Sequence, residues 1–272
     1  MQLVIEAGKT EGLYWRDLWR YRELFYFMAW RDILVRYKQT VVGIAWSVVR
    51  PLLTMLVFTF VFQKLAKMPS DGDVPYPVLI FAALVPWQFF ANALTECSNS
   101  LILNTNLVSK VYFPRIILPT SAVIVSFVDL LISLVLLVIL MLAYHVAPDW
   151  HILALPGFML LAFAAAMGAG YWLAALNVKY RDFRYVVPFI AQFGFYMSPV
   201  GYSITRVPEK WRLLFALNPM VGPIDGFRWA ILRGKSPLYP PGIVVSALAI
   251  GLIFASSLWY FRRTERKFAD II

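Results

Sequence analysis

Charged residues and cysteine are scarce in this sequence of 272 residues. Asp, Glu, Lys and Arg make up 15% of the chain, whereas hydrophobic residues make up 61% and the mean hydropathy is +0.69. A soluble globule of this length cannot hide so much apolar surface, which excludes an ordinary soluble domain. Cys97 is the only cysteine, which excludes a disulfide framework or a paired-thiol metal site within one chain. Lipid is therefore expected to surround most of this chain.

Motifs for catalysis and cofactor binding are also missing. The stretches "AGKT" (7–10) and "RGKS" (233–236) resemble the end of a phosphate-binding loop, but Leu3 and Trp229 stand where that loop needs glycine. His145 and His151 share one loop without a third ligand, so we expect no metal site. No Ser/His/Asp set has a sensible placement. We therefore predict no catalytic residue, metal or cofactor in this chain.

Basic residues exceed acidic ones, and the formal charge is +10. In a chain this apolar, basic residues that flank membrane spans and meet anionic lipid headgroups explain the excess better than nucleic-acid binding. The first thirty residues carry several charges that interrupt any signal-peptide core, so we expect the N-terminus to be retained. These charges are Arg16, Asp17, Arg20, Arg22 and Glu23.

Long apolar runs predict an all-α membrane protein with one integral-membrane domain over 1–272. A span needs roughly 20 mostly apolar residues, and uniform runs without alternation favour helices over barrel strands. We expect six spans, at 43–63, 77–95, 117–144, 152–176, 185–204 and 242–261, followed by a tail over 262–272.

The distribution of basic residues predicts the orientation of these spans. Sixteen Lys and Arg fall on the side of the bilayer that holds both termini, and eight fall on the other side. The positive-inside rule therefore places both termini in the cytoplasm.

Two charged residues lie inside predicted spans. Arg50, followed by Pro51, is about seven residues, or roughly 10 Å, inside the first span. Its side chain either snorkels back to the cytoplasmic interface beside a kink or faces a wet cavity in the bundle. For Asp129, deep in the third span, we expect a partner on a neighbouring helix rather than a proton relay, because no chain of ionisable residues surrounds it.

Two segments outside the spans have helical patterns. Residues 14–28 place apolar side chains on one stripe, with arginines off it, which favours a helix in the cytoplasmic interface over a soluble helix packed on a partner. The stripe consists of Tyr14, Leu18, Tyr21, Phe25 and Met28. Residues 205–236 contain two short amphipathic stretches, 208–217 and 222–233, around the break "NPMVGP". We interpret them as a re-entrant helical hairpin in the outer leaflet that borders a solvated passage.

Four segments resemble the permease subunits of type-2 ABC exporters for cell-surface polysaccharides such as O-antigen, teichoic acid and capsule. They are "RDILVRYKQTVVGIAWSVVRPLLTMLVFTFVF" (31–62), "LVSKVYFPRIILP" (107–119), "NVKYRDFRYVVPF" (177–189) and "NPMVGPIDGFRWAILRG" (218–234). They occur in order and extend over nearly the whole chain. Arg50 departs from the pattern, in which glutamine or another residue often precedes the proline.

The resemblance implies a homodimer that works with two cytoplasmic ATPase subunits, which bind ATP and magnesium. The complex would export a lipid-linked polysaccharide across the bacterial inner membrane, as in lipopolysaccharide biosynthesis. The segment 14–38 would be an interface helix and its lead-in, 104–115 would hold the helix that touches the ATPase, and 208–233 would form an external gate.

Candidate site residues follow from this interpretation. Aromatic faces that stack on sugars along the path are Trp46, Phe58, Phe60, Phe62, Phe189, Phe193, Phe195 and Tyr196. Cationic candidates for a lipid diphosphate are Arg31, Arg36, Lys38 and Arg50. Candidates for ATPase coupling are Asn104, Leu107, Lys110, Tyr112, Phe113 and Arg115. Candidates for the external gate are Trp211, Phe215, Asn218, Pro219, Gly222, Pro223, Phe227 and Trp229.

Two other functions compete with polysaccharide export. A type-2 ABC exporter of drugs or small lipids would share the architecture with less aromatic lining. An ion-coupled carrier or channel would need more buried acidic residues and internal repeats, and the sequence has neither.

Overall fold

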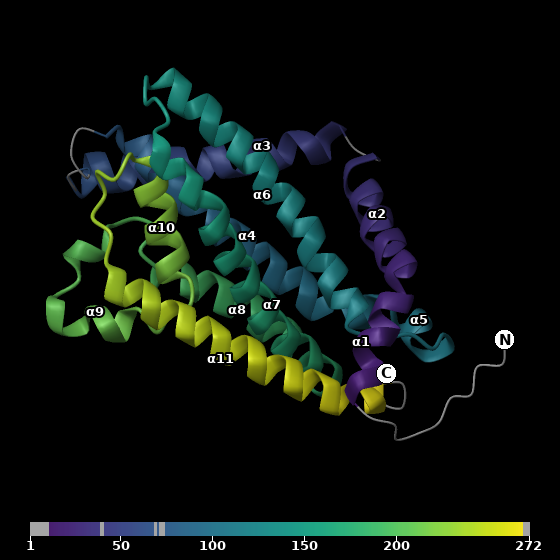
Figure 1. Ribbon diagram of the computed structural model, residues 1–272. Helices are drawn as coiled ribbons and strands as arrows, with labels where there is room; N and C mark the ends of the chain where they lie inside the picture. Colours follow the sequence, from purple (N-terminus) through teal and green to yellow (C-terminus); the bar gives the residue numbers. More distant parts are fainter. Residues whose placement is uncertain (1–10, 39–40, 68–69, 71–73, 269–272) are drawn as a thin grey trace.

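The computed structural model describes residues 11–38, 41–67, 70 and 74–268, and every regular element in these residues is helical (Figure 1). The long helices are α2 (Arg22–Lys38), α3 (Val41–Phe58), α4 (Tyr76–Leu103), α6 (Ile117–Ala143), α7 (Leu155–Lys179), α8 (Phe183–Tyr196) and α11 (Pro240–Thr264). The short ones are α1 (Glu11–Arg20), α5 (Thr105–Lys110), α9 (Glu209–Phe215) and α10 (Val221–Ile231). A π-helical turn, Thr59–Leu65, continues α3, and a 3-10 turn, Trp150–Ala154, leads into α7. The all-α prediction is confirmed.

Helix α4 is the core of the bundle. In its most apolar stretch 78% of the residues are buried, against 11–33% in the other long apolar helices. Small residues such as Ala82, Ala83 and Ala93 allow α6 and α7 to pack closely on it. Gly170 of α7 also allows close packing: a Cβ at this position would lie only 2.5 Å from Sγ of Cys97 on α4. The other long helices therefore surround α4 and turn an outer face away from it.

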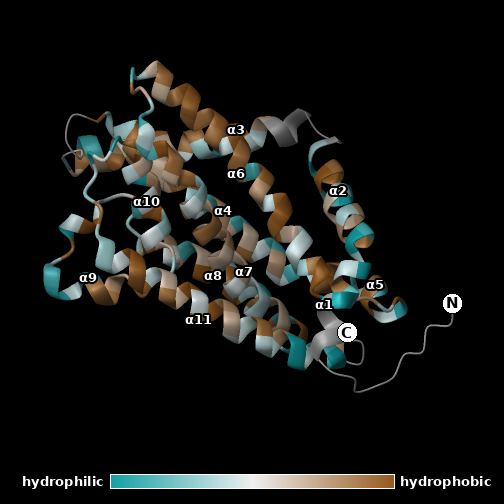
Figure 2. Ribbon diagram, in the orientation of Figure 1, coloured by the Kyte–Doolittle hydropathy of each residue, from teal (hydrophilic) through white to brown (hydrophobic). Residues whose placement is uncertain are grey.

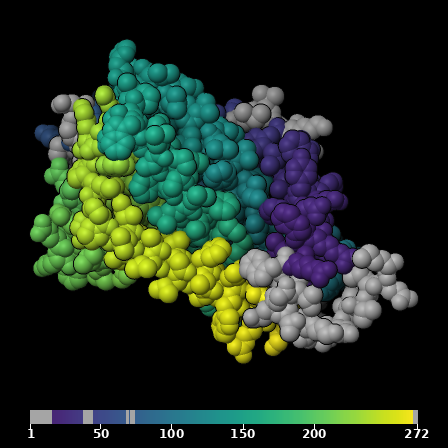
Figure 3. Space-filling view, viewed as in Figure 1, coloured from purple at the N-terminus to yellow at the C-terminus, as the bar shows by residue number. Residues whose placement is uncertain are grey.

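These outer faces are apolar (Figure 2). On α6, Leu131, Val135 and Leu142 lie on one exposed stripe, and α11 lies across the same side of the molecule (Figure 3). Water would make this surface unstable, whereas lipid hydrocarbon solvates it at no cost. The exposed stripes therefore indicate helices that face a bilayer.

Five helices in the described residues are long and apolar enough to cross a membrane. They are Ala45–Leu65, Tyr76–Leu103, Ile117–Ala143, Trp150–Lys179 and Pro240–Lys267. The predicted fifth span, 185–204, is wrong as a single helix, because α8 has 14 residues and ends at Tyr196. Pro199 explains the end: its ring disfavours helical backbone at Ser198, and a turn follows.

One end of the bundle brings together α1, α5 and the last turn of α11 (Figure 1). A hydrogen bond from the Arg115 guanidinium to the Glu265 carbonyl joins the start of α6 to the end of α11. We call this the α5 end. The opposite end, the α9 end, holds α9 and the start of α11, and there Tyr76 donates a 3.1 Å hydrogen bond to the Gly201 carbonyl.

The predicted interface helix is two helices, α1 and α2, that meet at Tyr21. Leu18, Tyr21 and Phe25 of the predicted stripe pack against the bundle core, and Met28 is buried. A different set of side chains is exposed, namely Trp19, Tyr26, Phe27 and Trp30. The described members of the stripe therefore face the bundle, where α6 packs against α2. The side chain of Tyr14 lies outside the described residues.

The two short helices predicted in 205–236 are confirmed. Helices α9 and α10 occupy 209–215 and 221–231, and the predicted break lies between them. Residues Val221 to Arg228 of α10 are all buried, and α10 packs against α4, α7 and α11. By contrast, α9 exposes Trp211, Leu213 and Leu214. The hairpin thus has one helix inside the bundle and one on its surface.

Candidate functional site

A cavity of about 830 Å³ lies among the end of α2 and helices α3, α4, α6 and α8. Its polar lining consists of Arg36, Tyr37, Ser47, Arg50, Thr54, Gln88, Asn92, Thr95, Asp129, Ser133 and Gln192. Its apolar lining consists of Trp46, Pro51, Phe58, Leu84, Trp87, Phe89, Ala91, Pro188, Ala191, Phe195 and Tyr196. A site of this size with aromatic walls and several amide and hydroxyl groups has the composition of a ligand site.

Half of the predicted path aromatics line this cavity. Trp46 and Phe58 come from α3, and Phe195 and Tyr196 come from α8. The Phe58 and Phe195 rings meet edge to face with their centroids 5.0 Å apart, so they form one aromatic wall across two helices. Residues that are far apart in the sequence therefore form this wall of the cavity.

The other four predicted aromatics are placed elsewhere. Phe60, Phe189 and Phe193 are exposed outside the lining. Phe62 lies over Gly201, where a Cβ would come 2.5 Å from its ring. These four side chains do not line the cavity, because α3 and α8 each turn only one face toward it.

Several lining residues were not predicted. Trp87 extends the aromatic wall, with its ring centroid 6.0 Å from that of Phe195. Gln88, Asn92 and Thr95 follow each other at spacings of four and three residues on α4, which places them on one helical face. Polar residues at this helical spacing are a sequence signal that would have identified them.

Asp129 has partners on a neighbouring helix, as predicted. Nη2 of Arg36 lies 3.1 Å from its Oδ2, and the Tyr37 hydroxyl donates a hydrogen bond to its Oδ1. Arg36 also lies 3.9 Å from Glu96 of α4. Burial and the neighbouring Asp129 carboxylate raise the pKa of Tyr37 well above its usual range, so its hydroxyl remains a donor. This cluster joins α2 to α6 at the edge of the cavity.

Arg50 lines the cavity, which is one of its two predicted placements. Its side chain is exposed to the open space, and no carboxylate in the described residues forms an ion pair with it. Pro51 follows it and is buried inside α3. Arg50 therefore contributes a positive charge that no neighbouring acid balances.

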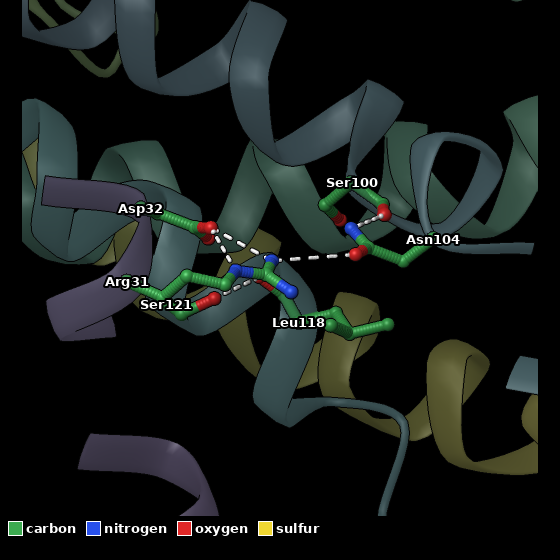
Figure 4. A network of polar contacts seen from close by, with 6 residues as sticks. All are labelled: Arg31, Asp32, Ser100, Asn104, Leu118 and Ser121. Atoms are coloured by element: carbon green, nitrogen blue, oxygen red, sulfur yellow. Dashed lines mark hydrogen bonds and ion pairs between the residues drawn. The ribbon is translucent and has the colours of Figure 1, made fainter. Parts of the chain in front are cut away.

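The other predicted cationic residues differ from Arg50. Arg31 lies away from the cavity, where its guanidinium binds Asp32 at 2.7 Å and Asn104 at 3.4 Å (Figure 4). Arg36 binds Asp129. The side chain of Lys38 lies outside the described residues. Of the described candidates, Arg50 alone is without a carboxylate partner.

The predicted coupling segment lies at the α5 end, with Tyr112 at the surface and Phe113 inside. Tyr112 is 61% exposed, and Leu107 and Lys110 belong to the short helix α5. Phe113 is only 4% exposed, so it has no surface to offer a partner protein. Asn104 and Arg115 join this segment to α2 and α11 through the bonds described above.

The predicted gate residues divide between the surface and the interior. Trp211 is exposed, Phe215, Pro219 and Trp229 are half-buried, and Gly222, Pro223 and Phe227 are buried. Asn218 ties the break to the end of α8 by donating to the Ser198 hydroxyl at 2.9 Å. The backbone N–H of Gly222 donates to Ser246 of α11 at 3.1 Å.

Arg228 of α10 is a buried residue that was not predicted. Its side chain is fully buried, and its guanidinium donates to the carbonyls of Val200 at 2.6 Å and Tyr202 at 2.5 Å. These hydrogen bonds connect the turn after α8 to α10. Gly226, two residues earlier on α10, leaves room for the Phe158 ring, which a Cβ would approach to 2.1 Å.

Long apolar helices with lipid-compatible faces and a polar cavity define a multi-pass helical membrane protein. Comparison with known proteins gives the family, because residues 23–232 match the family described as ABC-2 type transporter. The chain therefore belongs to the ABC-2 type transporter family, as a membrane subunit for transport. Membership implies an ATPase partner.

Named relatives resemble this chain over nearly its whole length. The O-antigen export system permease protein RfbA of Myxococcus xanthus is 29% identical over 260 residues, which cover 94% of this chain and 98% of the relative. An O-antigen export system permease protein RfbA of Klebsiella pneumoniae is 26% identical over 250 residues, covering 89% of this chain and 92% of the relative. A second one from Klebsiella pneumoniae is 25% identical over 249 residues.

Proposed function

We propose that this chain is the membrane-spanning subunit of an ATP-driven exporter of a lipid-linked polysaccharide of the O-antigen kind. Two copies would work with two cytoplasmic ATPase subunits, which bind ATP and magnesium, and the complex would lie in the bacterial inner membrane. The observation that carries the proposal is the cavity, because it combines aromatic walls with amide and hydroxyl groups. Similarity to three permeases named for O-antigen export supports the choice of substrate.

The lining suits a glycan better than a drug or a small lipid. Flat aromatic rings stack on the C–H faces of sugars, and amide groups such as Gln88, Asn92 and Gln192 both donate and accept hydrogen bonds. An apolar drug would leave these polar groups without partners, at a cost of roughly 1–3 kcal/mol each. The polar stripe on α4 therefore favours the polysaccharide exporter.

Six crossings with both termini in the cytoplasm agree with the arrangement of the helices. Five full spans alone would leave the first and last helices at opposite ends, but α1 and the end of α11 share the α5 end (Figure 1). The segment 183–204 makes the remaining crossing, with α8 as its helical part. The α9 end is then external, and α9 and α10 form a re-entrant gate there.

The open faces of α3 and α8 suit a homodimer with the passage between two copies. Only 11% of the apolar stretch of α3 is buried within the chain, and Trp46 and Tyr196 are exposed on the cavity. A second copy that covers these faces would enclose the two cavities from the side and keep lipid out of them. A polar route in hydrocarbon needs such a wall, because charged and polar groups avoid lipid contact.

Deletion of the gene tests the proposal. Loss of the surface glycan, with accumulation of the lipid-linked glycan inside the cell, is expected, and a plasmid copy of the gene should restore export. Immunoblotting of surface polysaccharide and mass spectrometry of the lipid-linked pool measure the two effects. An unchanged surface glycan in the deletion strain would contradict polysaccharide export.

A further inference from the structure

Two of the three charged residues that line the cavity pair with each other, and the third does not. Arg36, Arg50 and Asp129 are its charged lining residues, and Arg36 and Asp129 are 3.1 Å apart. The hydroxyl of Tyr37 also donates a hydrogen bond to the Asp129 carboxylate. Glu96, which lies 3.9 Å from Arg36, is not among the lining residues. Arg50 has no carboxylate partner in the described part of the chain, so it is the one charged lining residue without an ion pair.

This charge lies inside the apolar span of α3. Arg50 is the sixth residue of the span Ala45–Leu65, about 8 Å along the helix at 1.5 Å per residue. A bare guanidinium at this depth is costly, and intramembrane charges that persist face a partner, a cavity or a transport path. Arg50 faces a cavity. An anion that enters this cavity would therefore bind in a partly dehydrated site, where charge–charge attraction is stronger than in water.

The neighbours of Arg50 suit an anionic sugar. Trp46 lies four residues earlier on α3 and lines the same cavity, so an indole face and a guanidinium stand one turn apart on one helical face. The Thr54 hydroxyl donates to the Arg50 carbonyl at 2.9 Å, so it leaves the guanidinium donors free. A sugar ring that stacks on Trp46 thus presents a carboxylate or phosphate to a planar fork that binds such groups with two hydrogen bonds.

Resting on the proposed function, we infer that Arg50 forms an anion subsite in the cavity and that the exported glycan carries acidic groups, either carboxylates or phosphates, in its repeating units. The same chemistry would bind the diphosphate of a lipid carrier. The diphosphate passes the site once for each polysaccharide molecule. The acidic groups of the repeating units would pass it throughout export. The position of Arg50 beside Trp46 favours the repeats, because a sugar ring that stacks on this indole brings its own acidic group to the guanidinium.

Binding to the full-length chain, purified with its ATPase in lipid nanodiscs, tests this inference. The probes are a tetrasaccharide of galacturonate, the same tetrasaccharide with its carboxylates reduced to alcohols, and inorganic diphosphate. We expect the acidic tetrasaccharide to bind about tenfold or more tightly than the neutral one, with a difference that shrinks in high salt. Arg50→Gln should abolish this difference without weakening binding of the neutral tetrasaccharide.

Two variants control for folding and for charge. Arg50→Lys keeps the charge but loses the planar fork, so it should keep part of the preference for the acidic probe. Lys64→Gln removes one charge from the π-helical continuation of the same span, outside the cavity lining, and should keep the full preference. An Arg50→Gln protein that elutes and melts like wild type while losing the preference supports the inference.

Three results would overturn it. The first is equal binding of the two tetrasaccharides to the wild-type chain. The second is an effect of Arg50→Gln on inorganic diphosphate alone, which would assign the residue to the lipid carrier. The third is a neutral composition of the glycan that disappears from the surface when the gene is deleted. In each case the loss of surface glycan on deletion would still stand, so the proposed function would survive the failure of this inference.

Discussion

Arg228 is the clearest case of a single residue that the surrounding structure makes important. A fully buried arginine is costly unless hydrogen bonds replace its hydration, and the Val200 and Tyr202 carbonyls do so here. Those carbonyls belong to the turn that ends α8, where Pro199 prevents the helix from continuing. The residue therefore holds together the turn and the hairpin that the proposed function places at the external gate.

We expect Arg228→Met to lower the thermal stability of the purified protein strongly. The change removes two charge-assisted hydrogen bonds, each of which contributes roughly 1.5–3 kcal/mol, and leaves two carbonyls without these donors. Size-exclusion chromatography with fluorescence detection after heating measures the effect. Arg206→Met, at an exposed arginine of the same external segment, is the matched control and should behave like wild type. Equal melting temperatures of the two variants would show that the Arg228 hydrogen bonds do not stabilise the fold.

Among the structural elements, the segment 104–115 contains two adjacent aromatic residues with different surroundings. Tyr112 projects from the surface of the α5 end, and Phe113 is buried in the core. An exposed aromatic residue is a typical anchor for a partner protein, whereas a buried one stabilises its own chain. The two neighbours should therefore respond differently to truncation.

Tyr112→Ala should weaken co-purification of the ATPase while the permease still inserts and melts normally. Phe113→Ala should instead lower the stability of the permease, because truncating a buried phenylalanine costs about 3–5 kcal/mol. Affinity purification of the tagged permease, with quantification of the bound ATPase and of the permease in the membrane, measures both. Stoichiometric ATPase with the Tyr112→Ala variant would remove this residue from the interface.

For the whole molecule, the two ends of the bundle define the orientation in the membrane. The α5 end carries the proposed contact with the ATPase and the α9 end carries the proposed gate, so only one orientation is compatible with export. The bias of basic residues toward the α5 end agrees with this orientation.

Cysteine labelling tests the orientation. In a Cys97→Ala background, a membrane-impermeant maleimide should label Leu217→Cys, an exposed position in the break after α9, in spheroplasts. Tyr112→Cys should react only after the membrane is opened. The native cysteine is buried, and its removal prevents background labelling in loosened protein. Labelling of Tyr112→Cys from outside would reverse the topology and contradict the proposed mechanism.

The sequence alone determined the features that depend on local composition. Apolar length predicts membrane helices because each span must satisfy its backbone internally, and "NPMVGP" predicts the break between α9 and α10 because Pro and Gly interrupt helices. The four segments that resemble polysaccharide permeases lie largely within the region that matches the ABC-2 family. An acid inside a predicted span, such as Asp129, also predicts a partner, since an isolated charge in lipid is costly.

Only the tertiary structure decided which face of each helix meets which neighbour. Helices that are apolar on every side give no periodic signal for their packed face, so the sequence could not place Phe58 in the cavity and Phe60 outside it. The same reason explains why the stripe on α1 and α2 packs against the bundle and why Phe113 lies inside. Arg50 illustrates the division most clearly: its charge and depth follow from the sequence, but its position on the cavity exists only because α3, α4 and α8 come together around it.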